Sequence, residues 1–254
     1  MPALNYKSYG QGEPVIILHG LFGMLDNWQT IARQLSEEYN VYLLDQRNHG
    51  KSPHTERFDY SDMAEDVSDF MEKEGILKAH VVGHSMGGKT AMQLALFYPE
   101  KIESLTVVDI APKAYKGGHQ EIFEALFSID LPTIESRKDA DEQLQATISN
   151  FGVRQFLLKN LTRQKTGGYA WKMNLPTIHE SYTAILSAIT SIDSFSGPVL
   201  FIRGGQSKYV ADIDKFIIKD LFPAADIVTI EGAGHWVHAE KPTELLEAVR
   251  RFIS

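Results

Sequence analysis

The sequence contains no cysteine. This absence excludes disulfides, thiolate metal sites and a cysteine nucleophile, so any covalent chemistry must use another side chain. Long apolar runs are absent too, because no stretch approaches the roughly 18 residues that a transmembrane helix needs. Residues 1–7 show no positive region followed by an apolar stretch, and we therefore expect a cytoplasmic protein without a membrane span.

Basic clusters are scarce as well. The chain carries a net charge of −8 and its lysines and arginines are scattered, so we expect no nucleic-acid partner. Its 254 residues, 43% of them hydrophobic, can form one packed α/β domain with an inserted subdomain. Nothing in the sequence indicates an oligomeric state.

Six short apolar runs, rich in β-branched residues, have the pattern of strands that are buried on both faces. They are 14–18, 41–44, 79–82, 105–108, 199–202 and 227–230. Helical periodicity occupies the stretches between them, at 27–38, 60–74 and 86–98. Strands that alternate with helices predict a doubly wound, mostly parallel sheet.

The alternation breaks between about residues 113 and 190. This stretch looks helical throughout, with predicted helices at 120–127, 139–150, 153–160 and 177–190. We interpret residues 113–190 as a helical cap inserted before the penultimate strand. The core then consists of residues 1–112 and 191–254.

Ser85 is the candidate nucleophile. It is the central residue of a G-x-S-x-G motif at 83–87, which joins a predicted strand to a predicted helix. The turn is too tight for side chains at positions 83 and 87, and it presents the serine at a helix N-terminus, which favours negative charge. The alternative is a serine that only caps the helix.

His235 is the candidate base, because a serine hydroxyl needs one within hydrogen-bond reach. It follows the last predicted strand in a glycine-rich loop, which emerges at the same edge of the sheet as Ser85. His238 is the rival base, and His235 with His238 is also readable as a metal pair for which no third ligand is evident. His84, inside the serine motif, is expected to pack beside the turn at the edge of the substrate site.

Asp109 is the candidate acid. It ends the strand before the cap, next to the predicted serine strand, from where a carboxylate can reach the same imidazole and hold its tautomer. Asp193 and Asp212 are alternative acids, and Asp109 is also readable as a residue that only caps the strand end.

The segment HGLFG at 19–23 closes the other strand that borders the site. We expect the backbone N–H groups of Leu21 and Met86 to form an oxyanion hole, with Phe22 as the alternative to Leu21. Phe22 and Trp236 are predicted to form walls of the substrate pocket.

Other polar and aromatic residues have structural interpretations. We read the turn at 45–52 as held by Asp45 and Arg47, and Lys89 as structural. Cap charges could meet the phosphates of a coenzyme A substrate but are better explained by a solvated face; they are Arg154, Lys159, Arg163 and Lys165. Cap aromatics could line an acyl pocket but are more typical of a core; they are Phe123, Phe127, Phe151, Phe156, Trp171 and Tyr182.

Six segments, in chain order, closely resemble the small bacterial YbfF-type esterases of the α/β-hydrolase superfamily: HGLFGMLDNW, DQRNHGKSP, GHSMGGK, VVDIAP, GGQSKYV and GAGHWVHAEKP. The resemblance spans nearly the whole chain, including FGVRQFLLKNL in the cap. It implies an esterase or thioesterase for short acyl esters or acyl-CoA thioesters, with the triad on Ser85, Asp109 and His235. Many members of the superfamily place the acid where this chain has Ser207, and a serine there agrees with the YbfF-type group.

We therefore expect a serine hydrolase that acts on a small acyl ester through an acyl-enzyme, with no metal or organic cofactor. One alternative is a hydrolase of carbon–carbon bonds on the same triad. The other is a ligand receptor of the same fold with little turnover, since a fold by itself does not determine function.

Overall fold

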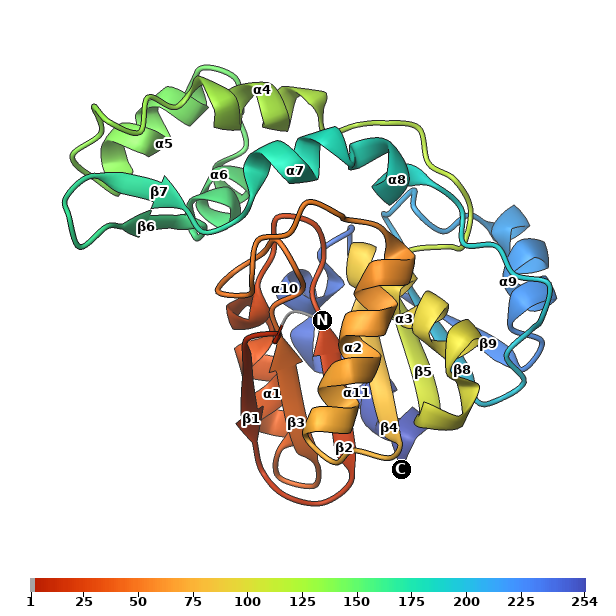
Figure 1. The fold of residues 1–254 in the computed structure, drawn as a ribbon. Helices are drawn as coiled ribbons and strands as arrows, with labels where there is room; N and C mark the ends of the chain where they lie inside the picture. Colours follow the sequence, from red (N-terminus) through yellow and green to blue (C-terminus); the bar gives the residue numbers. More distant parts are fainter. Residues whose placement is uncertain (1–2) are drawn as a thin grey trace.

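The computed structural model, shown in Figure 1, describes residues 3–254. Met1 and Pro2, which begin the segment examined for a targeting signal, lie outside the described residues. Seven strands form one sheet in the order β1-β3-β2-β4-β5-β8-β9, with only β1 antiparallel to its neighbour. Their bounds are β1 Tyr6–Tyr9, β2 Pro14–Leu18, β3 Asn40–Leu44, β4 Ala79–His84, β5 Ile102–Val108, β8 Val199–Gly204 and β9 Ala225–Ile230.

The predicted α/β-hydrolase architecture is confirmed, and each of the six predicted strands lies within a strand of the structure. The seventh strand, β1, was not anticipated from its sequence. Its residues YKSY are mostly exposed at the edge of the sheet, so they lack the apolar pattern of a buried strand.

Helices cover both faces of this sheet, as Figure 1 shows. Ile16 and Leu18 of β2 pack with α2 and α3, whereas Val15 and Ile17 pack with α1 and α11. Because successive side chains of a strand point to opposite faces, both faces of a central strand must be apolar. The helices of the core are η1 Leu25–Trp28, α1 Gln29–Leu35, α2 Tyr60–Lys73, α3 Met86–Phe97, η2 Pro99–Lys101, η3 Asp212–Asp214, α9 Lys215–Leu221, α10 Val237–Glu240 and α11 Pro242–Ile253.

The segment between β5 and β8 lies above the upper edge of the sheet in Figure 1. Its elements are α4 Gln120–Ser128, α5 Arg137–Gln145, α6 Phe151–Leu158, β6 Leu161–Arg163, β7 Tyr169–Trp171, α7 Leu175–Glu180 and α8 Tyr182–Leu186. The expectation that this segment is helical throughout is wrong, because β6 and β7 form an antiparallel hairpin. Three-residue strands are too short to show a period of two. The turn relies on Gly167 and Gly168, which have positive φ angles of 93° and 77°.

The strand order reverses at β2. The chain runs from β2 to β3 on one side, and then places β4 on the other side of β2. In such sheets, ligands bind at the carboxyl ends of the strands where the order switches. The loops that follow β2, β4, β5 and β9 all emerge at this edge, beyond which residues 113–190, called the cap segment below, lie in Figure 1. Among residues 3–254, no helix combines the length and apolarity that crossing a bilayer requires.

Candidate active site

The turn between β4 and α3 holds Ser85 in a strained conformation, with φ of 53° and ψ of −119°. Glycines make this turn possible. A Cβ at Gly83 would lie 2.2 Å from the carbonyl oxygen of Gly87, and one at Gly87 would lie 2.4 Å from that of Leu18. The G-x-S-x-G pattern therefore follows from the close approach of three backbone segments, which leaves the serine hydroxyl at the start of a helix.

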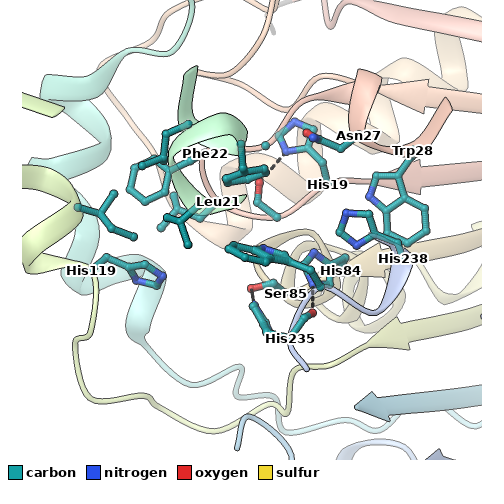
Figure 2. Close-up of a pocket in the computed structure, with 17 residues that line it drawn as sticks. His19, Leu21, Phe22, Asn27, Trp28, His84, Ser85, His119, His235 and His238 are labelled. Carbon is teal, nitrogen blue, oxygen red and sulfur yellow. Dashed lines mark hydrogen bonds between the residues drawn. The ribbon is translucent and has the colours of Figure 1, made fainter. Parts of the chain in front are cut away.

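Ser85, His235 and Asp109 form a continuous chain of hydrogen bonds. The Ser85 Oγ lies 3.1 Å from His235 Nε2, and His235 Nδ1 lies 2.8 Å from Asp109 Oδ2. Figure 2 shows the serine and the imidazole side by side. The structure thus brings together the three residues that the sequence nominated from three separate loops.

The rival residues lie elsewhere. His238 stacks on the Trp28 ring, with centroids 4.7 Å apart and planes at 14°, as Figure 2 also shows. Asp212 forms an ion pair with Arg203 at 2.7 Å, and its side chain is largely exposed. Asp193 is exposed as well. Of the candidate bases and acids, only His235 and Asp109 contact one another.

Asp109 is fully buried, and its carboxylate is held by several donors. Oδ1 accepts the backbone N–H of Gly204 at 2.9 Å, and Oδ2 accepts the Ser207 hydroxyl as well as His235 Nδ1. Sequence reasoning missed the role of Ser207. The available signal was a hydroxyl at the position where many members of the superfamily carry the acid itself.

The imidazole of His235 is also held from its face and its backbone. The Tyr209 ring stacks on it, with centroids 3.8 Å apart and planes at 16°. The carbonyl oxygen of His235 accepts a hydrogen bond from His84 Nε2 at 2.8 Å. Burial lowers the pKa of His84 well below its ordinary value, so this ring stays neutral and donates through Nε2 alone. His84 lines the site, as expected, and Tyr209 was not anticipated.

The loop after β2 turns sharply at residues 20–23, where Gly23 N–H donates to Gly20 O at 2.9 Å. Phe22 donates its own N–H to His49 Nε2 at 3.2 Å, so this N–H is not free for a substrate. The N–H groups of Leu21 and Met86 have no acceptor among residues 3–254. Of the two alternatives that the sequence left open, the hydrogen bonds favour Leu21 over Phe22.

Two cavities meet at Ser85, and Leu21 and His119 border both. The larger has a volume of about 600 Å³; its other walls are Tyr60, Met86, Lys89, Ile110, Tyr115, Lys116, Gly117, Gly118, Tyr182, Ile185, Leu186, Lys208 and Tyr209. The smaller has a volume of about 60 Å³ and is drawn in Figure 2. It contains His235 and both predicted pocket walls, Phe22 and Trp236.

The polar residues that the sequence analysis read as structural make buried contacts. The carboxylate of Asp45 accepts the backbone N–H groups of Leu25 and Lys51, each at 2.8 Å. Arg47 pairs with Asp66 at 2.6 Å. Lys89, in α3, donates from Nζ to the carbonyl oxygens of residues 113 and 187, at either end of the cap segment.

The cap charges divide into two groups. Lys159, Arg163 and Lys165 are exposed, as a solvated face predicts. Arg154 is not part of that face, because it is buried and pairs with Asp141 at 2.8 Å. The six cap aromatics divide too: Phe156 and Tyr182 line the cavities, Phe123 is buried, Trp171 is half-buried, and Phe127 and Phe151 are exposed.

Comparison with known proteins agrees with this geometry. Residues 13–242 match the family described as alpha/beta hydrolase fold. The chain is 38% identical to esterase YbfF of Escherichia coli, covering 99% of this chain and 97% of that protein. It is 39% identical to the sn-1-specific diacylglycerol lipase ABHD11 of Mus musculus, covering 94% and 80% respectively. A solved structure described as a marine microorganism esterase superposes with a TM-score of 0.97 at 43% identity, covering 99% of this chain and 100% of that one.

Proposed function

The chain belongs to the α/β-hydrolase fold family, among its YbfF-type esterases, and we propose that it hydrolyses carboxylic esters through an acyl-enzyme on Ser85. In this proposal His235 is the general base and Asp109 orients it. The observation that carries the proposal is the chain of hydrogen bonds from Asp109 through His235 to Ser85, at the point where two cavities meet.

The reaction has two halves. His235 Nε2 accepts the Ser85 proton while Oγ attacks the ester carbonyl carbon, and the N–H groups of Leu21 and Met86 stabilise the resulting oxyanion. His235 then donates that proton to the leaving alcohol, and the carbon–oxygen bond of the ester breaks. Water attacks the acyl-enzyme by the same route, releasing the carboxylic acid and restoring Ser85.

The position of His235 supports a separate role for each of the two cavities in binding the substrate. Because the imidazole must protonate the leaving group, that group belongs on the side lined by His235 and Trp236, which is the smaller cavity. The acyl chain then enters the larger cavity beside Leu21 and Met86. A volume of about 600 Å³ falls within the roughly 300–1,000 Å³ of small-molecule sites and favours acyl chains longer than acetyl.

Two finer statements belong to the same proposal. Acyl-CoA thioesters are included as substrates, since a thiol leaving group needs the same attack by Ser85 and the same oxyanion hole. A cytoplasmic site of action is included too, and fractionation of cells that express the chain tests it directly.

The decisive experiment measures hydrolysis of p-nitrophenyl esters from acetyl to palmitoyl, and of the matching acyl-CoAs. Wild type and Ser85→Ala are compared, and matching circular dichroism spectra serve as the control for folding. We expect wild type to turn over at least one ester series and Ser85→Ala to lose at least about a thousandfold in kcat. A fluorophosphonate should label wild type at Ser85 only. Wild-type protein that neither turns over any substrate nor is labelled would refute the proposal and favour a receptor or another chemistry.

A further inference from the structure

Phe22 occupies an unusual backbone conformation next to the proposed oxyanion hole. It is the third residue of the turn at 20–23, and its φ is 59°. Such a turn position favours glycine, because a side chain strains the backbone there. Phe22 keeps this conformation only because contacts with its surroundings hold it, and these contacts come from both the core and the cap segment.

Both backbone polar groups of Phe22 are bound by side chains. Its N–H donates to His49 Nε2 at 3.2 Å, in the core. Its carbonyl oxygen accepts Asn160 Nδ2 at 2.7 Å, and Asn160 lies between α6 and β6 of the cap segment. The Phe22 ring also packs edge-on against Phe123 of α4, with centroids 5.2 Å apart. The residue next to Leu21 is therefore clamped between core and cap.

Asn160 is itself rigidly held. It is fully buried, and its Nδ2 also donates to the backbone oxygen of Leu157 at 3.3 Å. The backbone carbonyl oxygen of Asn160 accepts the N–H of Lys172 at 2.8 Å. Its Oδ1 is buried without a partner among residues 3–254. A buried polar atom without a hydrogen-bond partner destabilises the folded state, so a purely structural role does not account for this amide. What it provides is a donor aimed at the Phe22 carbonyl.

We propose that Asn160 is a positioning residue, which couples docking of the cap to the geometry of the oxyanion hole. This inference rests on the proposed esterase function. Without the Asn160 hydrogen bond, Phe22 relaxes toward negative φ, the turn at 20–23 rotates, and the N–H of Leu21 moves away from the oxyanion. A displacement of about 1 Å at such a donor costs on the order of a hundredfold in rate. Asn160 does not contact the substrate itself.

The test compares Asn160→Ala and Asn160→Asp with a matched control. Asn160→Asp keeps the shape of the side chain but removes the donor. The control is Asn174→Ala, which also deletes an amide between cap and core, because Asn174 Nδ2 donates to Asn48 Oδ1 at 3.1 Å. This control contact does not touch the turn at 20–23.

Four quantities separate positioning from simple destabilisation: kcat and KM for the best ester, and the inhibition constants of a trifluoromethyl ketone and of its methyl ketone analogue. Only the trifluoromethyl ketone forms a stable hemiketal whose oxyanion needs the Leu21 N–H. We expect kcat of both Asn160 variants to be about 10- to 100-fold lower than that of wild type, with little change in KM. The inhibition constant of the trifluoromethyl ketone should rise by the same factor. Binding of the methyl ketone and the rates of Asn174→Ala should stay close to wild type.

Folded Asn160 variants with wild-type kcat would overturn the inference, and so would an equal loss of kcat in Asn174→Ala. If the variants do not fold, the wild-type protein decides: its Asn160 side-chain amide resonance should shift when the trifluoromethyl ketone binds, and an unchanged resonance would refute the coupling. An active wild type with active Asn160 variants rejects this inference alone. A wild type without ester turnover or labelling at Ser85 rejects the proposed function instead.

Discussion

Ser207 donates its hydroxyl to the same carboxylate oxygen of Asp109 that receives His235 Nδ1. The loops that follow the neighbouring strands β5 and β8 thus meet at one carboxylate, which in turn holds the imidazole of His235. Many members of the superfamily carry the acid at position 207, whereas here the acid lies on the preceding strand and the hydroxyl at 207 supports it. A buried carboxylate without such donors would be strongly destabilised.

Replacing Ser207 with alanine tests that support. Hydrogen bonds to charged groups contribute about 1.5–3 kcal/mol, so Ser207→Ala should lower kcat/KM by about tenfold or more and reduce the free energy of unfolding by about 1–2 kcal/mol. Ester kinetics and urea unfolding measure the two effects. Ser128→Ala, which removes a hydroxyl bonded only to Ala125 O in α4, is the control and should leave both quantities unchanged. Wild-type kinetics in Ser207→Ala would show that Asp109 does not need this donor.

Asp109→Asn should fold normally and lose about four powers of ten in kcat, because an amide at this position no longer holds the imidazole in the required tautomer. Steady-state ester hydrolysis measures the loss. Adding Ser207→Asp to Asp109→Asn should place a carboxylate beside the same imidazole. The kcat of this double variant should be at least about tenfold higher than that of Asp109→Asn alone. A rate near wild type in Asp109→Asn alone would remove Asp109 from the triad.

The assignment of the larger cavity to the acyl chain predicts a change in specificity. Leu186→Trp fills part of this cavity, so the ratio of kcat/KM for octanoyl to that for acetyl ester should fall at least about tenfold. The ratio is obtained from the p-nitrophenyl series. Val153→Trp, in the smaller cavity, is the matched control and should not change this ratio. The opposite pattern would exchange the roles of the two cavities.

Stability should decrease as the pH falls below about 6.5. Burial lowers the pKa of several histidines, to about 4 for His19 and about 3 for His49 and His238. Below 6.5 the unfolded chain binds protons that these folded imidazoles do not. The contribution of these histidines to the free energy of unfolding is therefore complete above pH 6.5. Between pH 6.5 and the lowered pKa of the folded state, each histidine loses up to about 1.4 kcal/mol of that contribution per pH unit.

Thermal unfolding between pH 8 and pH 5 measures this loss. His238→Phe keeps an aromatic ring against Trp28 without a titratable group, so its unfolding temperature should depend less on pH than that of wild type. His54→Phe changes an exposed histidine and should follow wild type. Equal pH dependence in all three proteins would contradict the assignment of neutral, buried histidines.

Much of the fold could be predicted because its signals are local. The apolar strands show the pattern of a sheet covered on both sides, and the glycines around Ser85 show the turn. The site was predictable where position along the chain implies position in space. Loops after parallel strands meet at one edge, which is why Ser85, Asp109 and His235 were nominated from the sequence.

The tertiary structure alone decided the rest. The contact of Asn160 with Phe22 joins residues 138 apart, and that of Ser207 with Asp109 joins residues 98 apart. No periodic or compositional pattern in the sequence predicts either contact, because a single buried hydrogen bond depends on how the loops pack in the tertiary structure. The division of the site into two cavities has the same origin. The sequence by itself determined the six apolar strands of the sheet, the helices between them and the nominated triad. Packing of the loops and of the cap determined the edge strand β1, the hairpin β6–β7 and the side chains that support the triad.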